Sequence, residues 1–298
     1  MLYDITHITR FDYDVPVLFA RCNLRLKPIA WAGQRLLDYD LSVEPGGELN
    51  TARAGAVLAN VTRMVVPQAV DRIEIVSRAL MEVDRPAQVP DPEDPTVAEV
   101  ARAARLDPEL GPEGPANYLF PTPLIPHDRA ITDWCAETLR PDRPIREAAF
   151  ALAVRIQKSF KFDPKATMVE TRPAEAFAKR GGVCQDFAQI MITGMRGLGL
   201  PAAYVSGFIR TIPPPGKERL VGADATHAWV LVWCGSEIGW VGVDPTNGIW
   251  MANDHIVTAI GRDYAEIAPV DGIFLGSGAQ HMDVSVDVAP KQMVAVSR

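Results

Sequence analysis

Short runs of alternating apolar and polar residues fill the first part of the chain. Such runs occupy residues 3–11, 23–28, 37–43, 63–66 and 72–76. A period of two places successive side chains on opposite faces of a β-strand, so each run can bury one face. Pro45-Gly46-Gly47 supplies a turn between two of the runs. We therefore predict a mostly antiparallel β domain over residues 1–90.

Proline dominates the segment that follows, with ten prolines between Pro86 and Pro126. Because proline has no backbone N–H and a fixed φ, it cannot continue a helix or lie inside a sheet. We expect a connector over residues 91–130. One short helix should interrupt it near residues 96–106, with Thr96 as the N-cap.

The pattern becomes helical after the connector. Apolar residues recur at spacings of three and four over residues 144–160, and again in a segment that starts at Cys184. This spacing places them on one face of a helix. Gly197-Leu198-Gly199-Leu200-Pro201 is typical of the end of the second helix. We expect both helices to pack against a second core.

Strand patterns dominate the rest of the chain. We predict strands at residues 203–209, 226–234, 237–244 and 282–288, a polar excursion at 213–216 and a helix near 253–259. Helices that precede a sheet are typical of an α+β fold. We expect this second domain to span residues 131–298, with the last strand as a C-terminal extension.

Size and charge narrow the classes of function. The 298 residues are 48% hydrophobic, carry a formal net charge of −7 and have a pI near 5.3. Because an acidic chain without a basic tract repels phosphate, we expect no nucleic-acid partner. The first residues do not resemble a secretory signal, and no apolar run reaches the roughly 18 residues of a membrane span. We expect a cytoplasmic protein with no membrane partner; the oligomeric state is not assigned.

The chain has four cysteines and no C-x-x-C spacing. They are Cys22, Cys135, Cys184 and Cys234. A chain of this size needs no disulfide bonds, so we expect four free thiols. A calcium loop of the D-x-D-x-D-G kind is not present either. We therefore expect neither a metal nor another cofactor.

Cys184 differs from the other cysteines because it follows Gly181-Gly182-Val183 at the expected start of a helix. Unpaired backbone N–H groups and the positive end of the helix dipole favour a thiolate there. A lone cysteine in such a place is nevertheless more often a small buried apolar residue. A catalytic thiol also needs a base.

His227 and Asp244 lie on consecutive predicted strands and can supply that base. A two-residue turn at Gly235-Ser236 would place them directly opposite each other, with Cβ atoms about 4.5–5.5 Å apart. Asp244 would then orient the imidazole, and the other ring nitrogen would face Cys184. A longer turn over 235–239 would shift the register and leave only a diagonal contact.

Four segments resemble the bacterial transglutaminase-like family, whose cysteine chemistry is papain-like. They are Gly182-Val183-Cys184-Gln185-Asp186-Phe187-Ala188, Tyr204-Val205-Ser206-Gly207-Phe208, Asp224-Ala225-Thr226-His227-Ala228-Trp229-Val230 and Gly239-Trp240-Val241-Gly242-Val243-Asp244-Pro245-Thr246-Asn247. Residues 7–13 are similar to the start of the family's β-rich N-terminal domain. The resemblance implies a papain-like core with Cys184 as nucleophile, His227 as base and Asp244 as the orienting acid.

Three further residues are candidates for substrate contact. Trp229 shares the face of His227, where it can either pack in the core or form a wall of the cleft. Asp263 and Tyr264 are candidates through the resemblance alone. Gln189 departs from the family motif, which usually carries histidine at that position.

These residues predict an enzyme that acts on a peptide or protein substrate. The thiol would attack a carboxamide or peptide carbonyl, form a thioacyl intermediate and deliver the acyl group to water or to an amine, with hydrolysis slightly favoured. One alternative is a catalytically silent protein that uses the same cleft to bind a peptide or act as a scaffold. Another is acyl transfer from a thioester donor, although no coenzyme motif is present.

Overall fold

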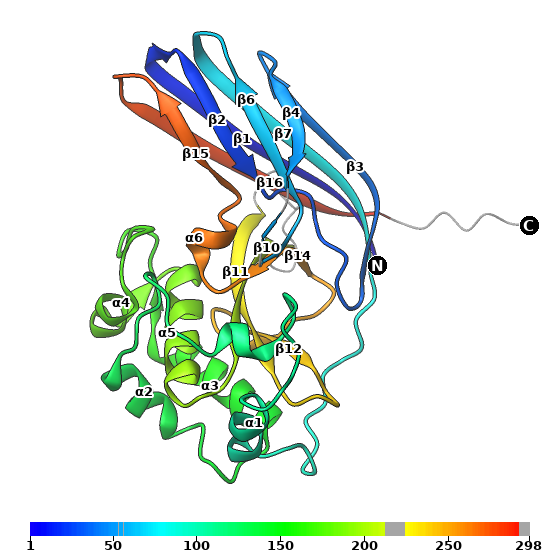
Figure 1. Cartoon of the computed structure of the whole chain (residues 1–298), viewed down its shortest axis with the longest axis vertical. Helices are drawn as coiled ribbons and strands as arrows, with labels where there is room; N and C mark the ends of the chain where they lie inside the picture. The colour runs from blue at the N-terminus through cyan, green and yellow to red at the C-terminus, as the bar shows by residue number, and fades with distance from the viewer. Residues whose placement is uncertain (53, 56, 212–223, 292–298) are drawn as a thin grey trace, which may run out of the picture.

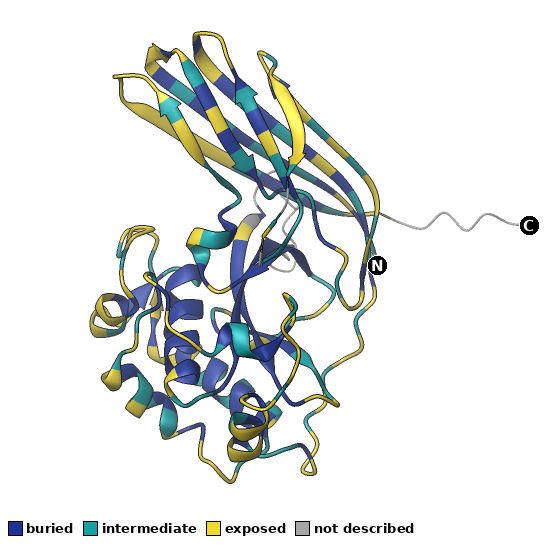
Figure 2. Ribbon diagram, in the orientation of Figure 1, coloured by how far each residue is buried: buried dark blue, intermediate teal, exposed yellow. Residues whose placement is uncertain are grey.

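A β-sandwich of two four-stranded antiparallel sheets forms the upper part of the molecule in Figure 1. The computed structural model describes residues 1–52, 54–55, 57–211 and 224–291. One sheet has the order β16-β1-β7-β3, with bounds Gln280–Lys291, Leu2–Val17, Val70–Val83 and Gln34–Glu44. The other has the order β15-β2-β6-β4, with bounds Val270–Leu275, Phe19–Leu24, Val61–Val66 and Glu48–Ala52. Buried and exposed residues alternate along most of these strands, as the period of two predicts (Figure 2).

The last two strands of the described chain complete this sandwich. β16 pairs with β1 from Leu2↔Lys291 to Tyr13↔Gln280, and β15 pairs with β2. The strand predicted at residues 282–288 is therefore confirmed and extends further at both ends. Its Val286 and Val288 are buried in one cluster with residues of β1 and β7. Both ends of the described chain thus contribute to one hydrophobic core.

The lower part of the molecule contains a six-stranded sheet and the helices, which together give an α+β fold as predicted (Figure 1). The sheet order is β13-β12-β11-β10-β14-β5, with bounds Ile249–Trp250, Trp240–Asp244, Ala225–Trp233, Ala202–Ile209, His255–Gly261 and Leu58–Ala59. The helices are α1 (Val97–Ala103), η1 (Pro115–Tyr118), α2 (Arg129–Ala136), α3 (Ile145–Ser159), α4 (Pro173–Lys179), α5 (Cys184–Gly197) and α6 (Tyr264–Ile267). A short parallel pair, β8 (Lys161–Phe162) and β9 (Gly181–Gly182), precedes α5.

Helix α5 lies at the centre of the second core. It packs on β10 and β11 and also contacts α2, α3 and α4. Its apolar residues, including Ile190, Met191 and Met195, are buried together with residues of the sheet. The predicted helices at 96–106, 144–160 and 184–198 are confirmed as α1, α3 and α5. No helix in the described part of the chain is long and apolar enough to cross a membrane.

Two sequence predictions differ from the structure. The helix predicted near residues 253–259 is wrong, because residues 255–261 form the fully buried strand β14. Its short run of apolar and β-branched residues is compatible with either a helix or a central strand, and periodicity cannot distinguish them. The strand predicted at 23–28 mostly lies beyond β2, which ends at Leu24. The polar excursion predicted at 213–216 lies outside the described residues.

Candidate active site

Cys184 is the first residue of α5, and its position is held by the turn before the helix. The Asp186 Oδ2 atom accepts hydrogen bonds from the Val183 backbone N–H at 2.8 Å and from the Thr167 hydroxyl at 2.6 Å. A Cβ atom on Gly182 would lie 2.4 Å from this same oxygen, so glycine is required there. The glycine turn and the Asp186 carboxylate together set where the thiol emerges.

The environment of Cys184 separates it from the other three thiols. Cys22, Cys135 and Cys234 are buried, and burial raises the pKa of each to about 12. They remain protonated and unreactive at neutral pH. Cys184 is the half-buried cysteine, and its side chain lies close enough to His227 to raise the pKa of that ring. The base expected from the sequence therefore lies beside this thiol.

The hairpin that carries His227 and Asp244 has the longer of the two turns considered. Trp233 pairs with Trp240, and the Gly239 N–H donates to the Gly235 carbonyl within the loop. The two-residue turn is therefore wrong, because Gly235 and Gly239, at φ of 103° and 73°, adopt left-handed conformations that extend the loop. His227 and Asp244 are diagonal neighbours, yet the His227 Nε2 and Asp244 Oδ2 atoms are 2.8 Å apart. Long side chains bridge the diagonal distance between strands.

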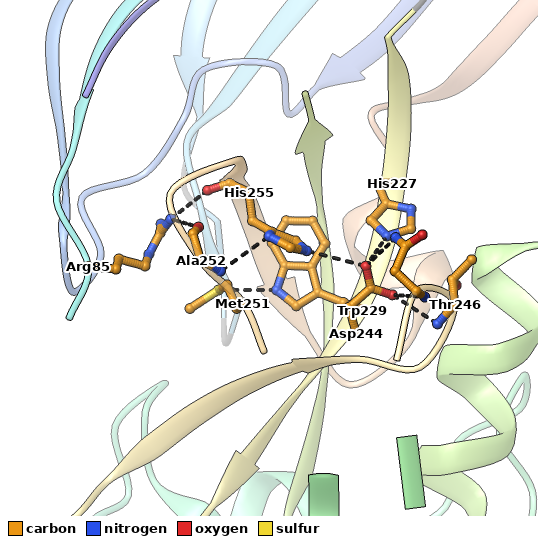
Figure 3. Close-up of polar contacts among 9 residues, drawn as sticks. Arg85, His227, Trp229, Asp244, Thr246, Met251, Ala252 and His255 are labelled. Carbon is orange, nitrogen blue, oxygen red and sulfur yellow. Dashed lines mark hydrogen bonds and ion pairs between the residues drawn. The ribbon is translucent and has the colours of Figure 1, made fainter. Parts of the chain in front are cut away.

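The Asp244 carboxylate is completely buried and receives hydrogen bonds at both oxygens (Figure 3). Oδ1 accepts the backbone N–H groups of Thr246 at 2.9 Å and Asn247 at 3.2 Å. Oδ2 accepts the side-chain amide of Asn247 at 2.7 Å and also faces two histidines. Burial raises the pKa of Asp244, but the hydrogen bonds from His227 and His255 outweigh burial and hold it well below its ordinary value. Asp244 is therefore an anion at neutral pH.

His227 lies between this anion and the thiol. Burial lowers its pKa, but the hydrogen bonds to Asp244 and Cys184 outweigh burial and raise the pKa to about 10. Because Nε2 contacts Asp244, Nδ1 is the ring nitrogen that remains for Cys184. This arrangement favours the imidazolium form of His227 next to the Cys184 side chain.

His255 is the site residue that the sequence analysis missed. Its Nε2 lies 3.3 Å from Asp244 Oδ2, and the ring is buried at the start of β14. Because the segment was predicted as a helix, nothing placed this histidine beside the hairpin. If the apolar run after His255 had been assigned to a strand, its pairing in the sheet would have brought this histidine close to the hairpin.

His227, Asp244 and His255 also have the donor types of a metal site, with ligand atoms all within 4.8 Å of one another. The backbone N–H of Ala252 donates to His255 Nδ1 at 3.3 Å, so this nitrogen must be the acceptor and Nε2 carries the proton. A protonated Nε2 cannot ligate a metal ion. The three residues therefore fit a hydrogen-bonded unit better than a metal centre.

Comparison with known proteins identifies the family. Residues 132–245 match the model of the transglutaminase-like superfamily, and residues 3–82 match the bacterial transglutaminase-like N-terminal region. Uncharacterised proteins of Mycobacterium tuberculosis and Mycobacterium bovis are each 35% identical over 298 residues, covering 97% of this chain and 92% of theirs. The chain belongs to the transglutaminase-like superfamily.

Two further proteins are similar to this transglutaminase-like chain. A protein-glutamine gamma-glutamyltransferase of Pseudomonas aeruginosa is 35% identical over 131 residues, which are 44% of this chain and 20% of that protein. The crystal structure of a candidate cysteine protease from Cytophaga hutchinsonii has a TM-score of 0.75 at 19% identity, covering 99% of this chain and 93% of that one. The second comparison shows that the two proteins share a fold. Membership of this superfamily supports a thiol-dependent enzyme in general.

The residues predicted to contact substrate occupy different places in this transglutaminase-like fold. Trp229 is fully buried, and its ring lies 5.9 Å from that of His227 and 5.1 Å from that of His255, which corresponds to the packing alternative. The Asp263 carboxylate caps α6 by accepting the Glu266 N–H. Tyr264 is half-buried and packs, like Cys184, against the central apolar cluster.

Proposed function

We propose that this protein is a thiol-dependent hydrolase or acyltransferase that acts on a carboxamide or peptide bond through Cys184, His227 and Asp244. The observation that carries the proposal is the position of His227, whose Nε2 lies 2.8 Å from the Asp244 carboxylate and whose pKa is also raised by the neighbouring Cys184 side chain. A thiol at a helix start beside a carboxylate-held imidazole has the parts of a cysteine nucleophile and its base. The substrate would be a peptide or protein.

The reaction would proceed in two acyl-transfer steps. The Cys184 thiolate attacks the carbonyl carbon, and the resulting oxyanion is placed near the Cys184 backbone N–H at the start of α5. The His227 imidazolium then donates its proton to the leaving nitrogen, so the C–N bond breaks and a thioester remains. Neutral His227 next removes a proton from the acceptor as it attacks the thioester. The C–S bond breaks, and the thiolate–imidazolium pair is restored.

The acceptor determines which activity results. Water would give amidase or peptidase activity, and a primary amine would give transamidation. The Pseudomonas aeruginosa relative is named a protein-glutamine gamma-glutamyltransferase, and its 35% identity over 131 residues supports keeping the acyltransferase branch. We favour hydrolysis, since water needs no acceptor subsite. A peptide-binding protein without turnover is the alternative, and an intact Cys, His and Asp set favours the enzyme over it.

The experiment that tests the proposal combines thiol labelling with turnover. We expect iodoacetamide near neutral pH to label Cys184 at least tenfold faster than Cys22, Cys135 or Cys234, as located by peptide mass spectrometry, because those three thiols are protonated. A glutamine-containing peptide should release ammonia, and an added primary amine should reveal any transamidation. Cys184→Ala should abolish release, whereas Cys22→Ala serves as the matched control and should retain it. Equal labelling of all four thiols would remove the basis of the proposal, and labelling without turnover would favour the binding protein.

A further inference from the structure

Two histidines share one oxygen of Asp244, but their environments make them chemically different. Both His227 Nε2 and His255 Nε2 face Asp244 Oδ2, at 2.8 and 3.3 Å. Burial lowers the pKa of both rings; in His227 the bonds to Asp244 and Cys184 reverse this effect, whereas in His255 the pKa stays below its ordinary value. His227 is therefore the ring that takes up the proton, and His255 remains a neutral donor.

The tautomer of His255 is set by the backbone around it. The Ala252 N–H points at Nδ1, so the single proton of the neutral ring lies on Nε2 and is donated to Asp244. The Trp229 ring packs edge-on against the imidazole, with centroids 5.1 Å apart. Both contacts restrict the rotation of the ring. His255 consequently presents its N–H to Asp244 in one orientation (Figure 3).

Residues of the β-sandwich hold the segment that carries His255. Arg85, two residues after β7, donates from Nη1 to the carbonyls of His255 at 2.6 Å and Ala252 at 2.9 Å. Its Nη2 donates to the Gln34 side-chain oxygen at 2.6 Å. That same oxygen accepts the Val257 N–H at 2.9 Å, and the Gln34 amide donates to the Val257 carbonyl at 2.8 Å. Arg85 and Gln34 therefore fix the backbone on both sides of the imidazole.

We propose that His255 is a positioning residue that orients the Asp244 carboxylate toward His227, and that Arg85 transmits this constraint from the β-sandwich. The proposal rests on the proposed function, because it assigns a role within the same site. Without His255, Asp244 keeps its backbone donors and the Asn247 amide but loses the donor that faces His227 across the shared oxygen. The sandwich would then help to keep the Asp244 carboxylate directed at His227.

The groups that face this pair come from several elements. Around Cys184 and His227 they are Asp244 on β12, His255 on β14, Tyr204 on β10 and, beyond His255, Arg85 after β7. Of these, Arg85 is a cation on the far side of His255 and opposes its protonation. A substitution at His255 should therefore change the pH dependence of Cys184 alkylation.

The test measures the rate of Cys184 alkylation by iodoacetamide between pH 4 and 9 in the full-length chain. The rise of this rate with pH on the acid side, called the acid limb here, reports formation of the thiolate–imidazolium pair. The measurement does not require turnover of a substrate. We expect His255→Leu to move the midpoint of this limb upward by about one pH unit, which corresponds to about a tenfold slower reaction on the acid side. His255→Gln should stay close to wild type, because its amide nitrogen can replace the Nε2–H donor. Arg85→Met should move the limb in the same direction as His255→Leu.

Controls separate positioning from general destabilisation. Arg35→Met removes an exposed arginine of the same sheet that pairs with Glu82, and it should leave the limb unchanged. If His255→Leu does not fold, His255→Asn provides the same comparison, because its shorter amide does not reach Asp244. If Cys184 is reactive in the wild type and the folded His255→Leu or His255→Asn variant shows the same acid limb, the positioning role is overturned. The proposed function would still stand. A wild-type Cys184 no faster than the other thiols would instead overturn the proposed function.

Discussion

Residue-scale chemistry at this site depends on one buried carboxylate with an unusual number of donors. Asp244 accepts hydrogen bonds from two backbone N–H groups, one amide and two imidazoles, which compensates for the cost of burying its charge. The anion in turn raises the pKa of His227. Without Asp244, burial would dominate and His227 would be neutral, so the thiol would lose its ionic partner.

Replacing the Asp244 carboxylate tests whether this anion raises the pKa of His227. In the wild type, the imidazolium of His227 should be lost only as the pH rises through about 10. Asp244→Asn removes the anion, so we expect the alkaline limit of turnover, which needs the imidazolium as general acid, to move to lower pH and turnover to fall by about 10³- to 10⁴-fold. Rates of ammonia release between pH 6 and 11 measure both effects. Asp271→Asn, at a carboxylate paired with Arg25 in the sandwich, is the control. An unchanged alkaline limit would contradict the role given to Asp244.

At the scale of elements, the start of α5 must be held in place for the thiol to face His227. The Asp186 carboxylate does this by accepting the Val183 N–H and the Thr167 hydroxyl. It thus joins the loop before α4 to the first turn of α5. The requirement for glycine at 182 has the same origin, since any Cβ there would displace this carboxylate.

Removal of the cap should affect both stability and reactivity. We expect Asp186→Ala to lower the free energy of unfolding by about 1–2 kcal/mol, as for other N-terminal caps, and to slow Cys184 alkylation several-fold. Urea unfolding and labelling rates measure the two effects. Thr96→Ala removes a comparable cap on α1, so it should cost about 1 kcal/mol and leave the labelling rate unchanged. Equal labelling of Cys184 in both variants would show that Asp186 does not position the thiol.

The whole molecule joins the two ends of the described chain in one sandwich. β16 pairs with β1 along twelve residue pairs, and β15 pairs with β2. In addition, β5 from the first part of the chain pairs with β14 of the six-stranded sheet. The first part of the chain therefore contacts the strand that carries His255 both through β5 and, from the sandwich, through Arg85 and Gln34.

This topology predicts that the first part of the chain does not fold alone. A fragment of residues 1–90 lacks β15 and β16, so β1 and β2 each lose a partner strand and the cluster around Tyr3 and Ile5 loses Val286 and Val288. Unsatisfied edges and an open core favour aggregation or disorder. We expect the fragment to lack cooperative thermal unfolding by circular dichroism, whereas the full chain shows it. A cooperative transition in the isolated fragment would refute this expectation.

Local patterns in the sequence were sufficient for most of the elements. The helices at Thr96, Pro144 and Cys184 were predictable because caps, proline and apolar spacing act within a few residues. The helix start and the two strand faces made Cys184, His227 and Asp244 candidates, and the resemblance to the transglutaminase-like family gave them their roles. The α+β fold followed from the order of these patterns.

Tertiary structure decided the features that depend on contacts between distant segments. The hairpin register depended on the conformation of loop residues 234–239, including Gly235 and Gly239, and the diagonal hydrogen bond between His227 and Asp244 formed despite the longer turn. The strand at His255 was ambiguous because burial on both faces removes the period of two. Its contact with Asp244, and the hold of Arg85 on its backbone, arise only when the sandwich packs against the sheet. Such packing brings together residues far apart in the chain, and no local pattern encodes it.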